Sequence, residues 1–370
     1  WKDENLWLRE KLGKESWESA KDSVLNAFFT DPYTVQAMWS MAEKMGFTGG
    51  RVLEPAVGTG NFISLMPMHI KQRSQVTAID LDITTAAIAK QLFPESNVQN
   101  MPYQKSKTPD NFYDLVISNV PFADIKIADR RYNQFNPNLH DYYFLKMLDQ
   151  VRPGGIVMAI TSSGTMDKQS EVIRRELAKK AELITSVRLP SGAFQEYAGT
   201  AVVTDIIVLR KRAEPLTMTP EVNWIGLSEV KTSSKPVKVN SFYAENLRNV
   251  LGDIDYGSGT TRFGAGMIVH RPHDLKQRLE KAADFVPENA LMPRHSEDHL
   301  TYYANKAGER TNTLTISNGG LMFVYGDQMV KATDLVEYKI KDAKKTAQRQ
   351  KSIEDLVEIR KAYTDLTDAE

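Results

Sequence analysis

Residues 51–62 read Arg-Val-Leu-Glu-Pro-Ala-Val-Gly-Thr-Gly-Asn-Phe, a short apolar strand that runs directly into a glycine-rich turn. Residues 61–70 then show a helical pattern of apolar positions. A strand, a glycine turn and a helix in this order are typical of the first crossing in a doubly wound α/β sheet, where ligands bind at the carboxyl ends of strands. Gly58 and Gly60 allow the backbone to turn tightly and to lie against a ligand with no Cβ in the way. An ordinary glycine-rich turn explains the pattern about equally well.

The residues at the two ends of this turn indicate which class of ligand it suits. A dinucleotide-binding fold requires Gly-x-Gly-x-x-Gly, and here Ile63 occupies the place of the third glycine. Glu54 lies ahead of the glycines, where a carboxylate would repel a pyrophosphate but would attract an amino group. The turn therefore favours a ligand that carries an amino group over a dinucleotide.

Strands and helices alternate along the first 210 residues. The pattern predicts strands at 51–54, 76–80, 114–118, 155–161, 183–189 and 201–209, and helices at 6–27, 33–45, 61–70, 84–92, 142–151 and 171–181. Strands separated by helices imply right-handed crossovers and a mostly parallel sheet covered on both faces. The last two strands have no helical pattern between them, so we expect them to pair as an antiparallel hairpin. The prediction is an α/β fold whose seven-stranded, mostly parallel sheet contains one antiparallel strand.

The composition is that of an ordinary globular protein, with 41% hydrophobic and 25% charged residues among 370. Basic and acidic residues each number 47, so the basic excess of a dedicated nucleic-acid binder is missing, although an enzyme that meets nucleic acid in one local cleft remains compatible. The chain has no cysteine, which excludes disulfides and thiolate metal sites and agrees with a cytoplasmic protein. No apolar run approaches the ~18 residues of a membrane span. Because the sequence starts at Trp1, we expect it to be a piece of a longer protein.

The length allows about two or three domains. We predict an N-terminal helical segment at 1–50, a catalytic domain at 51–212 and a smaller α+β extension at 213–370. Within the extension, turn residues between short β runs predict a hairpin or meander at 314–331. A charged helix is expected at 339–363, and its apolar stripe favours a docking role.

A second polar segment, Ala78-Ile79-Asp80-Leu81-Asp82, ends the strand at 76–80. A carboxylate at this position can accept hydrogen bonds from both hydroxyls of a ribose, and it follows the glycine turn by close to the ~20 residues expected. Asp80 is a better candidate than Asp82 because it lies nearer the end of the strand. A solvated acid at a strand end is the competing interpretation.

The segment Ser118-Asn119-Val120-Pro121-Phe122 follows the strand at 114–118. Asn119 offers a side-chain carbonyl acceptor, the next backbone carbonyl offers a second, and Phe122 offers a flat ring for stacking. Two acceptors and an aromatic ring suit the exocyclic amino group of a planar base. An asparagine-initiated turn with a packed phenylalanine would look the same in isolation.

Further motifs accompany these segments between residues 28 and 212. They are Phe29-Thr30-Asp31-Pro32, His140-Asp141-Tyr142-Tyr143-Phe144, Arg152-Pro153-Gly154-Gly155, Leu189-Pro190-Ser191-Gly192-Ala193-Phe194 and Thr204-Asp205-Ile206-Ile207-Val208-Leu209. In their order and spacing the motifs resemble the adenine-N6 DNA methyltransferases, which are amino-methyltransferases with an Asn-Pro-Pro-Phe type of motif. The chain is similar in particular to type I modification subunits of restriction-modification systems and to methylase–helicase fusion proteins of mobile elements.

The resemblance implies a Rossmann-like, S-adenosylmethionine-dependent methyltransferase fold. It also implies transfer of a methyl group to the N6 amino group of adenine in DNA, with the base flipped out of the duplex. The implied catalytic residues are Asn119, Val120, Pro121 and Phe122. The implied binding residues for S-adenosylmethionine are Thr30, Glu54, Pro55, Ala56, Gly58, Gly60, Asn61, Phe62, Asp80, Leu81, Gln99 and Asn100.

Some of these assignments carry a specific role or a departure from the family pattern. Thr30 would reach the carboxylate of the cofactor, and Asp80 would hold its ribose. Gln99 or Asn100 falls where the family more usually has an aspartate that contacts the adenine of the cofactor. Val120 replaces the commoner first proline of the catalytic motif; it keeps the backbone carbonyl but loses the fixed φ of proline.

The segment 123–140 carries Lys126, Arg130 and Arg131 among aromatic residues, a pattern that suits a cover over phosphate and a displaced base. A solvated surface loop explains it equally well. DNA is the expected partner, together with a helicase or specificity region outside this fragment; neither a metal nor a membrane is expected. Two alternatives stay open: an RNA or protein-glutamine N-methyltransferase, and a noncatalytic module that only binds cofactor or a partner within a larger methylase–helicase protein.

Overall fold

The computed structural model describes residues 30–122, 125–191, 202–257 and 266–293, four short stretches at 302–304, 314–317, 320–325 and 328–331, and a few isolated residues near both ends. The chain forms two compact units. The first contains Trp1–Ser106 and Phe112–Met292, and the second contains Lys107–Asn111 and Pro293–Glu370. The helices expected at 6–27 and 339–363 lie largely outside the described residues.

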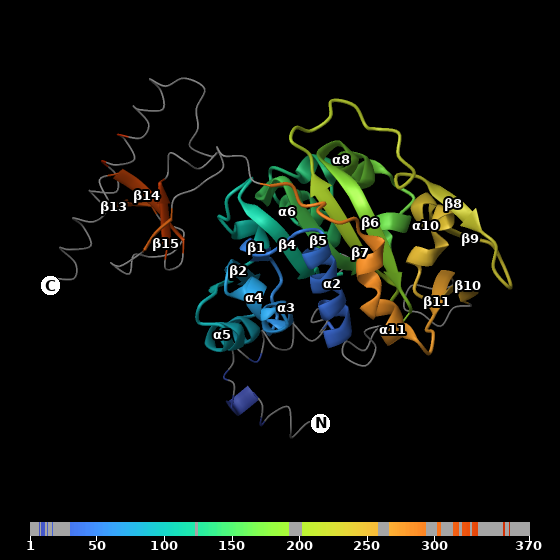
Figure 1. Cartoon of the computed structure of the whole chain (residues 1–370), viewed down its shortest axis with the longest axis horizontal. Coiled ribbons are helices and arrows are strands. Elements are labelled where there is room, and N and C mark those ends of the chain that lie inside the picture. The colour runs from blue at the N-terminus through green and yellow to red at the C-terminus, as the bar shows by residue number, and fades with distance from the viewer. Residues whose placement is uncertain are drawn as a thin grey trace. The chain divides into compact units, whose positions relative to one another are not determined.

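A seven-stranded sheet forms the centre of the first unit (Figure 1). Its strands are β1 (Gly50–Glu54), β2 (Ser74–Asp80), β3 (Asn97–Asn100), β4 (Tyr113–Asn119), β5 (Val151–Ser162), β6 (Ala181–Leu189) and β7 (Thr204–Lys211), in the order β3-β2-β1-β4-β5-β7-β6. β7 lies between β5 and β6 and is antiparallel to both, whereas the other neighbouring pairs are parallel. The predicted seven-stranded, mostly parallel sheet with one antiparallel strand is therefore confirmed.

Helices cover both faces of this sheet (Figure 1). They are α2 (Pro32–Lys44), α3 (Asn61–Ser64), α4 (Met68–Lys71), α5 (Ile83–Leu92), α6 (Leu139–Gln150), α7 (Gly164–Asp167) and α8 (Val172–Lys180), with short 3₁₀ turns η1 (Tyr103–Lys105) and η2 (Asn133–Phe135). The helix predicted at 61–70 was wrong as a single element, because α3 and α4 are separate. Pro67 caps α4, and a proline has no backbone N–H with which to continue α3.

The main hydrophobic core lies between α2 and the sheet. Val35, Met38 and Trp39 of α2 are at most 1% exposed, and they join a buried cluster that contains Val52 of β1 and Ile117 of β4. The helix starts at Pro32 because Asp31 precedes it and its carboxylate accepts a hydrogen bond from the backbone N–H of Thr34 at 3.0 Å. The segment just before α2 is thereby fixed against the sheet.

Residues 213–292 continue in the same compact unit. Their elements are β8 (Leu227–Val230), β9 (Val237–Asn240), α10 (Ser241–Glu245), η3 (Leu247–Asn249), β10 (Asp253–Gly257), β11 (Gly266–His270), α11 (Leu275–Glu280) and η4 (Ala282–Phe285). The backbone N–H groups of Leu251 and Ser191 donate to the carbonyls of Arg188 and Val269, both at 2.8 Å, so this part of the chain is bonded to the end of β6. The domain boundary at residue 212 stays a prediction.

The second unit contains a four-stranded antiparallel sheet. Its strands are β12 (Tyr302–Ala304), β13 (Leu314–Ser317), β14 (Gly320–Tyr325) and β15 (Gln328–Lys331), in the order β12-β15-β14-β13. β13, β14 and β15 pair consecutively, as the predicted meander at 314–331 requires. Met322, Val324 and Met329 form a small core of their own.

Candidate active site

Three polar side chains come from the carboxyl ends of three neighbouring strands. Glu54 ends β1, Asp80 ends β2 and Asn119 ends β4, and the sheet order places β1 between the other two. Neighbouring strands lie about 4.8 Å apart, so these ends meet at one edge of the sheet. The three segments singled out in the sequence are thus brought together.

The glycine turn after β1 lies directly against the end of β2. The backbone N–H of Gly58 donates to Oδ2 of Asp80 at 2.7 Å. Gly58 has a φ of 52° and Gly60 a φ of 90°, both in the left-handed region that favours glycine. A Cβ on Gly60 would collide with the ring of Phe93, whereas a Cβ on Gly58 would meet no atom within 4 Å. The backbone at Gly58 therefore borders open space that a ligand can fill.

The carboxylate of Asp80 is held in one orientation by neighbouring donors. Its Oδ1 accepts from the backbone N–H of Asp82 at 2.8 Å and from the hydroxyl of Thr85 at 3.2 Å. Burial raises the pKa of Asp80 above its usual range, and the hydrogen bonds from Asp82 and Gly58 partly oppose this. A carboxylate oxygen can accept more than one hydrogen bond, so Asp80 keeps capacity for the two hydroxyls of a ribose.

Glu54 is a carboxyl buried at the centre of this edge. It is 2% exposed, and its Oε2 has no hydrogen-bond partner among the residues that the structure describes. Burial raises the pKa of Glu54 well above its usual value, and the nearby charge of Asp80 raises it further. A buried polar group without a partner is unfavourable, and the amino group of a bound ligand would supply the missing donor.

Gln99 and Asn100, the two candidates at the end of β3, differ in their surroundings. Gln99 is buried, and neither its Oε1 nor its Nε2 has a partner in the described part of the chain. Asn100 instead donates through Nδ2 to the carbonyls of Asp80 and Leu81, both at 3.1 Å. Gln99 therefore has hydrogen-bonding capacity for a ligand, and Asn100 fastens β3 to the end of β2. The side chain of Leu81 is 70% exposed and offers an apolar surface beside Asp80.

Thr30 connects the glycine turn with the catalytic motif. Its carbonyl accepts from Nδ2 of Asn61 at 3.1 Å, and its hydroxyl accepts from Nδ2 of Asn119 at 3.0 Å. Phe62, expected to pack against the cofactor, is 2% exposed within the core, and its carbonyl accepts from the indole of Trp39 at 3.0 Å. Pro55 is buried and Ala56 half-buried in the turn between β1 and Gly58.

The catalytic motif continues the line of β4 towards β5. The backbone N–H of Val120 donates to the carbonyl of Ile160 at 3.0 Å, and the Val120 side chain is fully buried. A proline at this position would lack that N–H, so this chain fixes the turn with a hydrogen bond where the commoner motif uses a restricted φ. Pro121 and Phe122 are half-buried, and Phe122 packs against the main core.

The three predicted nucleic-acid-binding residues differ in their contacts. Lys126 pairs with Asn138, the residue before α6, and Arg130 is exposed. Arg131 forms an ion pair with Asp149 at 2.9 Å, in the last turn of α6. Asp149 lies about eight residues after the first turn of α6, which corresponds to ~12 Å along the helix. The guanidinium of Arg131 is therefore bound near the C-terminal end of α6.

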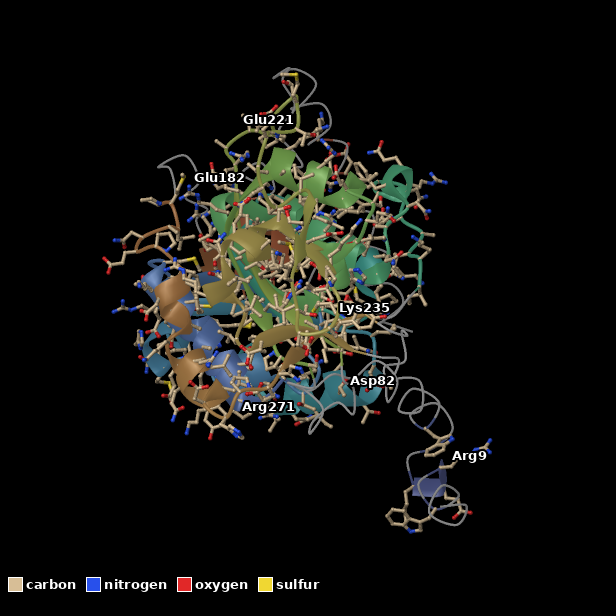
Figure 2. The ribbon with its side chains drawn as sticks, turned by 90° about the vertical axis from the view of Figure 1, so that its right-hand side faces the viewer. Arg9, Asp82, Glu182, Glu221, Lys235 and Arg271 are labelled. Carbon is tan, nitrogen blue, oxygen red and sulfur yellow. The ribbon has the colours of Figure 1, made fainter. Side chains whose placement is uncertain are left out.

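The contacts of Lys211 show which edge of the sheet Asp149 occupies. Lys211 ends the reversed strand β7, and its Nζ donates to the carbonyls of Asp149 and of Val151, the first residue of β5. These residues therefore lie at the edge where the parallel strands begin. In Figure 2, Glu182 at the start of β6 and Asp82 after β2 appear towards opposite ends of the view.

Tyr143 of α6 is a residue of this region that sequence reasoning left without a role. It is 8% exposed, and burial raises the pKa of its hydroxyl strongly, with a further contribution from the charge of Asp80. Tyr143 thus lies close enough to the site to sense Asp80. The sequence indicated only that Tyr143 belongs to the motif at 140–144. It did not indicate that Tyr143 lies near Asp80.

The chain is similar to a known protein family and to a phage protein. A family model described as N-6 DNA Methylase matches residues 17–257. "Defense against restriction protein B" of Escherichia phage P1 is 27% identical over 232 residues, which make up 61% of this chain and 10% of that protein. The chain thus spans about a tenth of the curated relative.

Solved structures of modification subunits give weaker similarity. The type I restriction-modification methyltransferase subunit from Streptococcus thermophilus is 14% identical with a TM-score of 0.42, covering 70% of this chain and 58% of that one. The EcoKI M protein is 12% identical with a TM-score of 0.41, covering 70% of each chain. Among the described residues there is no helix long and apolar enough to cross a membrane, and no group of three His, Cys, Asp or Glu side chains arranged to hold a metal.

Proposed function

This chain belongs to the N-6 DNA methylase family, and from that premise we propose that it transfers the methyl group of S-adenosylmethionine to the N6 amino group of adenine in DNA. The fold is that of S-adenosylmethionine-dependent methyltransferases, and S-adenosylmethionine is the cofactor. The observation that carries the proposal is the hydrogen bond between Asn119 and Thr30, because it joins an amide at the end of β4 to the cofactor side of the same edge.

The residues at this edge fit the chemical groups of the cofactor. Glu54 is a buried carboxyl whose Oε2 has no donor among the described residues, and the amino group of a methionine moiety would supply one. The open space at Gly58 admits the chain of that moiety, and Asp80 can accept from the ribose. Leu81 offers an apolar surface for the adenine ring, and Gln99 offers an amide that has no hydrogen-bond partner in the part of the chain that the structure describes. Bound there, the cofactor supplies an electrophilic methyl group on a sulfonium.

The residues of the catalytic motif act on the target amino group. The nitrogen of an exocyclic amino group is conjugated with the ring and is a poor nucleophile. Oδ1 of Asn119 and the carbonyl of Val120 would accept hydrogen bonds from its two N–H groups and thereby favour the pyramidal geometry that attack requires. They would also hold the nitrogen in place for in-line attack, so positioning contributes much of the acceleration. The nitrogen gains the methyl group and loses one proton to solvent, and the sulfonium leaves as a neutral thioether. The flipped base stacks on the ring of Phe122.

Two alternatives have the same site geometry. RNA adenine and protein glutamine also present an amino or amide nitrogen to two acceptors. A noncatalytic module would be expected if the departure at Val120 had disrupted the motif. The hydrogen bond from Val120 to Ile160 supports catalysis instead, because it keeps the turn ordered without proline.

The proposal extends to partners through the relatives. The phage protein is named for defence against restriction, and the two solved structures described above are of type I restriction-modification subunits. We infer that this chain is one part of a larger assembly that binds DNA, with a helicase or specificity region supplied outside the fragment. Lys126 and Arg130, exposed after the catalytic motif, are the residues we propose for phosphate contact.

The experiment that tests the proposed function compares substrates under one condition. The protein is incubated with methyl-labelled S-adenosylmethionine and, separately, mixed-sequence double-stranded DNA, single-stranded DNA, RNA and a glutamine-containing peptide. We expect label in DNA, and we expect Asn119→Ala to abolish it. Asn223→Ala is the matched control, since that exposed asparagine donates only to Glu245 in the described structure. Label in RNA or peptide alone, or equal DNA labelling by Asn119→Ala, would overturn the proposal.

A further inference from the structure

Residues 266–280 carry exposed cations close to the catalytic edge of the sheet. Val269 in β11 exchanges two hydrogen bonds with Ser191, which follows the end of β6. The N–H of Ser191 donates to the Val269 carbonyl at 2.8 Å, and the N–H of Val269 donates to the Ser191 hydroxyl at 2.9 Å. Because β6 is parallel to β4, its last residues lie at the same edge as Asn119. Arg271 is exposed two residues after Val269 and therefore lies close to this edge.

Lys276 in α11 is linked to the site through α2. Its Nζ lies 4.5 Å from the ring centroid of Tyr33, which is 45% exposed in the first turn of α2. Thr30, three residues before Tyr33, accepts a hydrogen bond from Asn119 at 3.0 Å. Three residues of chain span at most ~11 Å. Lys276 therefore lies within one turn of duplex DNA, about 35 Å, of Asn119.

Lys235 lies beside the hairpin of β10 and β11. It is exposed in the loop between β8 and β9, and its Nζ is 5.4 Å from the ring centroid of Tyr256 in β10. Figure 2 shows Lys235 and Arg271 in the lower part of the first unit, as it does Asp82. Glu182, at the opposite edge of the sheet, lies in the upper part. We define the cation surface as Lys235, Arg271 and Lys276.

The cation surface has no carboxylate partner among the described residues, unlike the cations next to it. His270 is bonded to Asp255 at 3.3 Å, and Arg278 forms an ion pair with Asp274 at 2.9 Å. Two members of the cation surface lie instead over tyrosine rings. Unpaired cations next to aromatic rings suit the backbone and the bases of a nucleic acid.

We propose that the cation surface binds phosphates of the DNA duplex beside the flipped adenine. The chain has equal numbers of basic and acidic residues, so DNA affinity requires a local concentration of cations. In the segment after the catalytic motif, Arg131 is paired with Asp149, and Nζ of Lys126 already donates to a backbone carbonyl. Cations elsewhere at this edge are therefore needed for part of the phosphate contacts. This inference deepens the proposed function and rests on it for the identity of the nucleic acid as DNA.

The salt dependence of DNA binding tests this surface without catalysis. Fluorescence anisotropy measures the Kd of the full chain for a fluorescent mixed-sequence duplex at several salt concentrations. The surface variant carries Lys235→Gln, Arg271→Gln and Lys276→Gln together. It should lower the slope of log Kd against log salt concentration by about three, because each lost phosphate contact removes about one unit. At about 0.1 M salt it should weaken binding on the order of 100-fold.

A matched variant removes three cations from the opposite edge of the sheet. Arg73 precedes β2, Lys90 lies in the last turn of α5, and Lys179 lies in the last turn of α8, just before β6. Changing all three to Gln alters the net charge equally and should leave the slope within about half a unit of wild type. Arg271→Lys combined with Lys276→Arg keeps both charges and should also retain the wild-type slope.

The inference would be overturned by an unchanged slope in the surface variant or by an equal fall in the opposite-edge variant. It would also be overturned if DNA binding by the wild-type chain did not depend on salt. Calorimetry with S-adenosylhomocysteine should give wild-type affinity for the surface variant, because the cation surface contacts only DNA. A loss of cofactor affinity as large as the loss of DNA affinity would contradict this role.

Methyl transfer by the same proteins keeps the two hypotheses distinguishable. A slope that depends on the cation surface, with no methyl transfer to DNA by the wild-type chain, would contradict the proposed function and support the surface. Methyl transfer to DNA with the same KM for DNA in the wild type and the surface variant would support the function and contradict the surface.

Discussion

The buried carboxyl of Glu54 is expected to destabilise the cofactor-free protein, and Glu54→Gln should relieve this. Glu54 is 2% exposed with Oε2 lacking a donor in the described structure, and burial together with Asp80 raises its pKa well above the usual value. Gln is nearly the same shape and carries no charge. The variant should therefore be more stable without cofactor, and it should bind S-adenosylmethionine more weakly, because a neutral amide attracts an ammonium less than a carboxylate does.

The magnitude follows from proton linkage. An unfolded glutamate releases its proton near pH 4.3, whereas folded Glu54 keeps its proton up to its raised pKa. Between these two values the folded state holds one proton more, so the free energy of unfolding falls by about 1.4 kcal/mol for each pH unit of increase. Above the raised pKa of Glu54, the free energy of unfolding no longer changes with pH through this group. For a unit of this size, 1 kcal/mol corresponds to about 2–4 °C in melting temperature.

The assay is thermal unfolding of the cofactor-free protein from pH 5 to pH 8. The melting temperature of Glu54→Gln minus that of the wild type should increase as the pH rises towards the raised pKa of Glu54. Glu221→Gln, at an exposed position (Figure 2), is the control and should give a pH-independent difference. A constant difference for Glu54→Gln, or wild-type cofactor affinity in that variant, would refute the reasoning.

Three further changes should have distinct results. Val120→Pro removes the backbone N–H that donates to β5 and should lower the free energy of unfolding by about 1–3 kcal/mol in urea titrations, and unchanged stability would contradict this role of the bond. Gly58→Ala should weaken cofactor binding on the order of tenfold, since its Cβ enters the space left for a ligand and its φ of 52° adds backbone strain. Gly60→Ala should lower the melting temperature more, because its Cβ also meets an aromatic ring. Arg188→Met should destabilise by about 3–5 kcal/mol, because the bidentate partner Asp205 is fully buried, and a urea midpoint equal to that of the wild type would contradict this.

The arrangement of the sheet could be predicted because its signals are local. Most of the strands contain a short apolar run, whereas the polar strand β3 has none. The missing helical pattern between β6 and β7 was enough to indicate the reversed strand. The positions of Glu54, Asp80 and Asn119 followed from strand ends alone, since parallel strands finish at one edge. Pro67 was a visible helix breaker within the predicted helix at 61–70, and its effect was underestimated.

The contacts that refine the site could not be predicted, because they join residues far apart in the sequence. The bond between Thr30 and Asn119 spans 89 positions, and Arg131 reaches Asp149 across a loop whose basic residues gave no sign of an ion pair. The pattern of charged residues indicates that a loop is polar, but it does not indicate which residues its side chains contact. The hydrogen bond that replaces proline at Val120 likewise depends on the register between β4 and β5.

The most direct test of the central claim is to identify which atom receives the methyl group. Mixed-sequence DNA is incubated with the wild-type chain and deuterium-methyl S-adenosylmethionine, digested to nucleosides and analysed by mass spectrometry against authentic standards. We expect deuterated N6-methyldeoxyadenosine from the wild-type reaction and none from the Asn119→Ala reaction. Label in N4-methyldeoxycytidine, or no labelled nucleoside from a protein that binds S-adenosylmethionine, would contradict it.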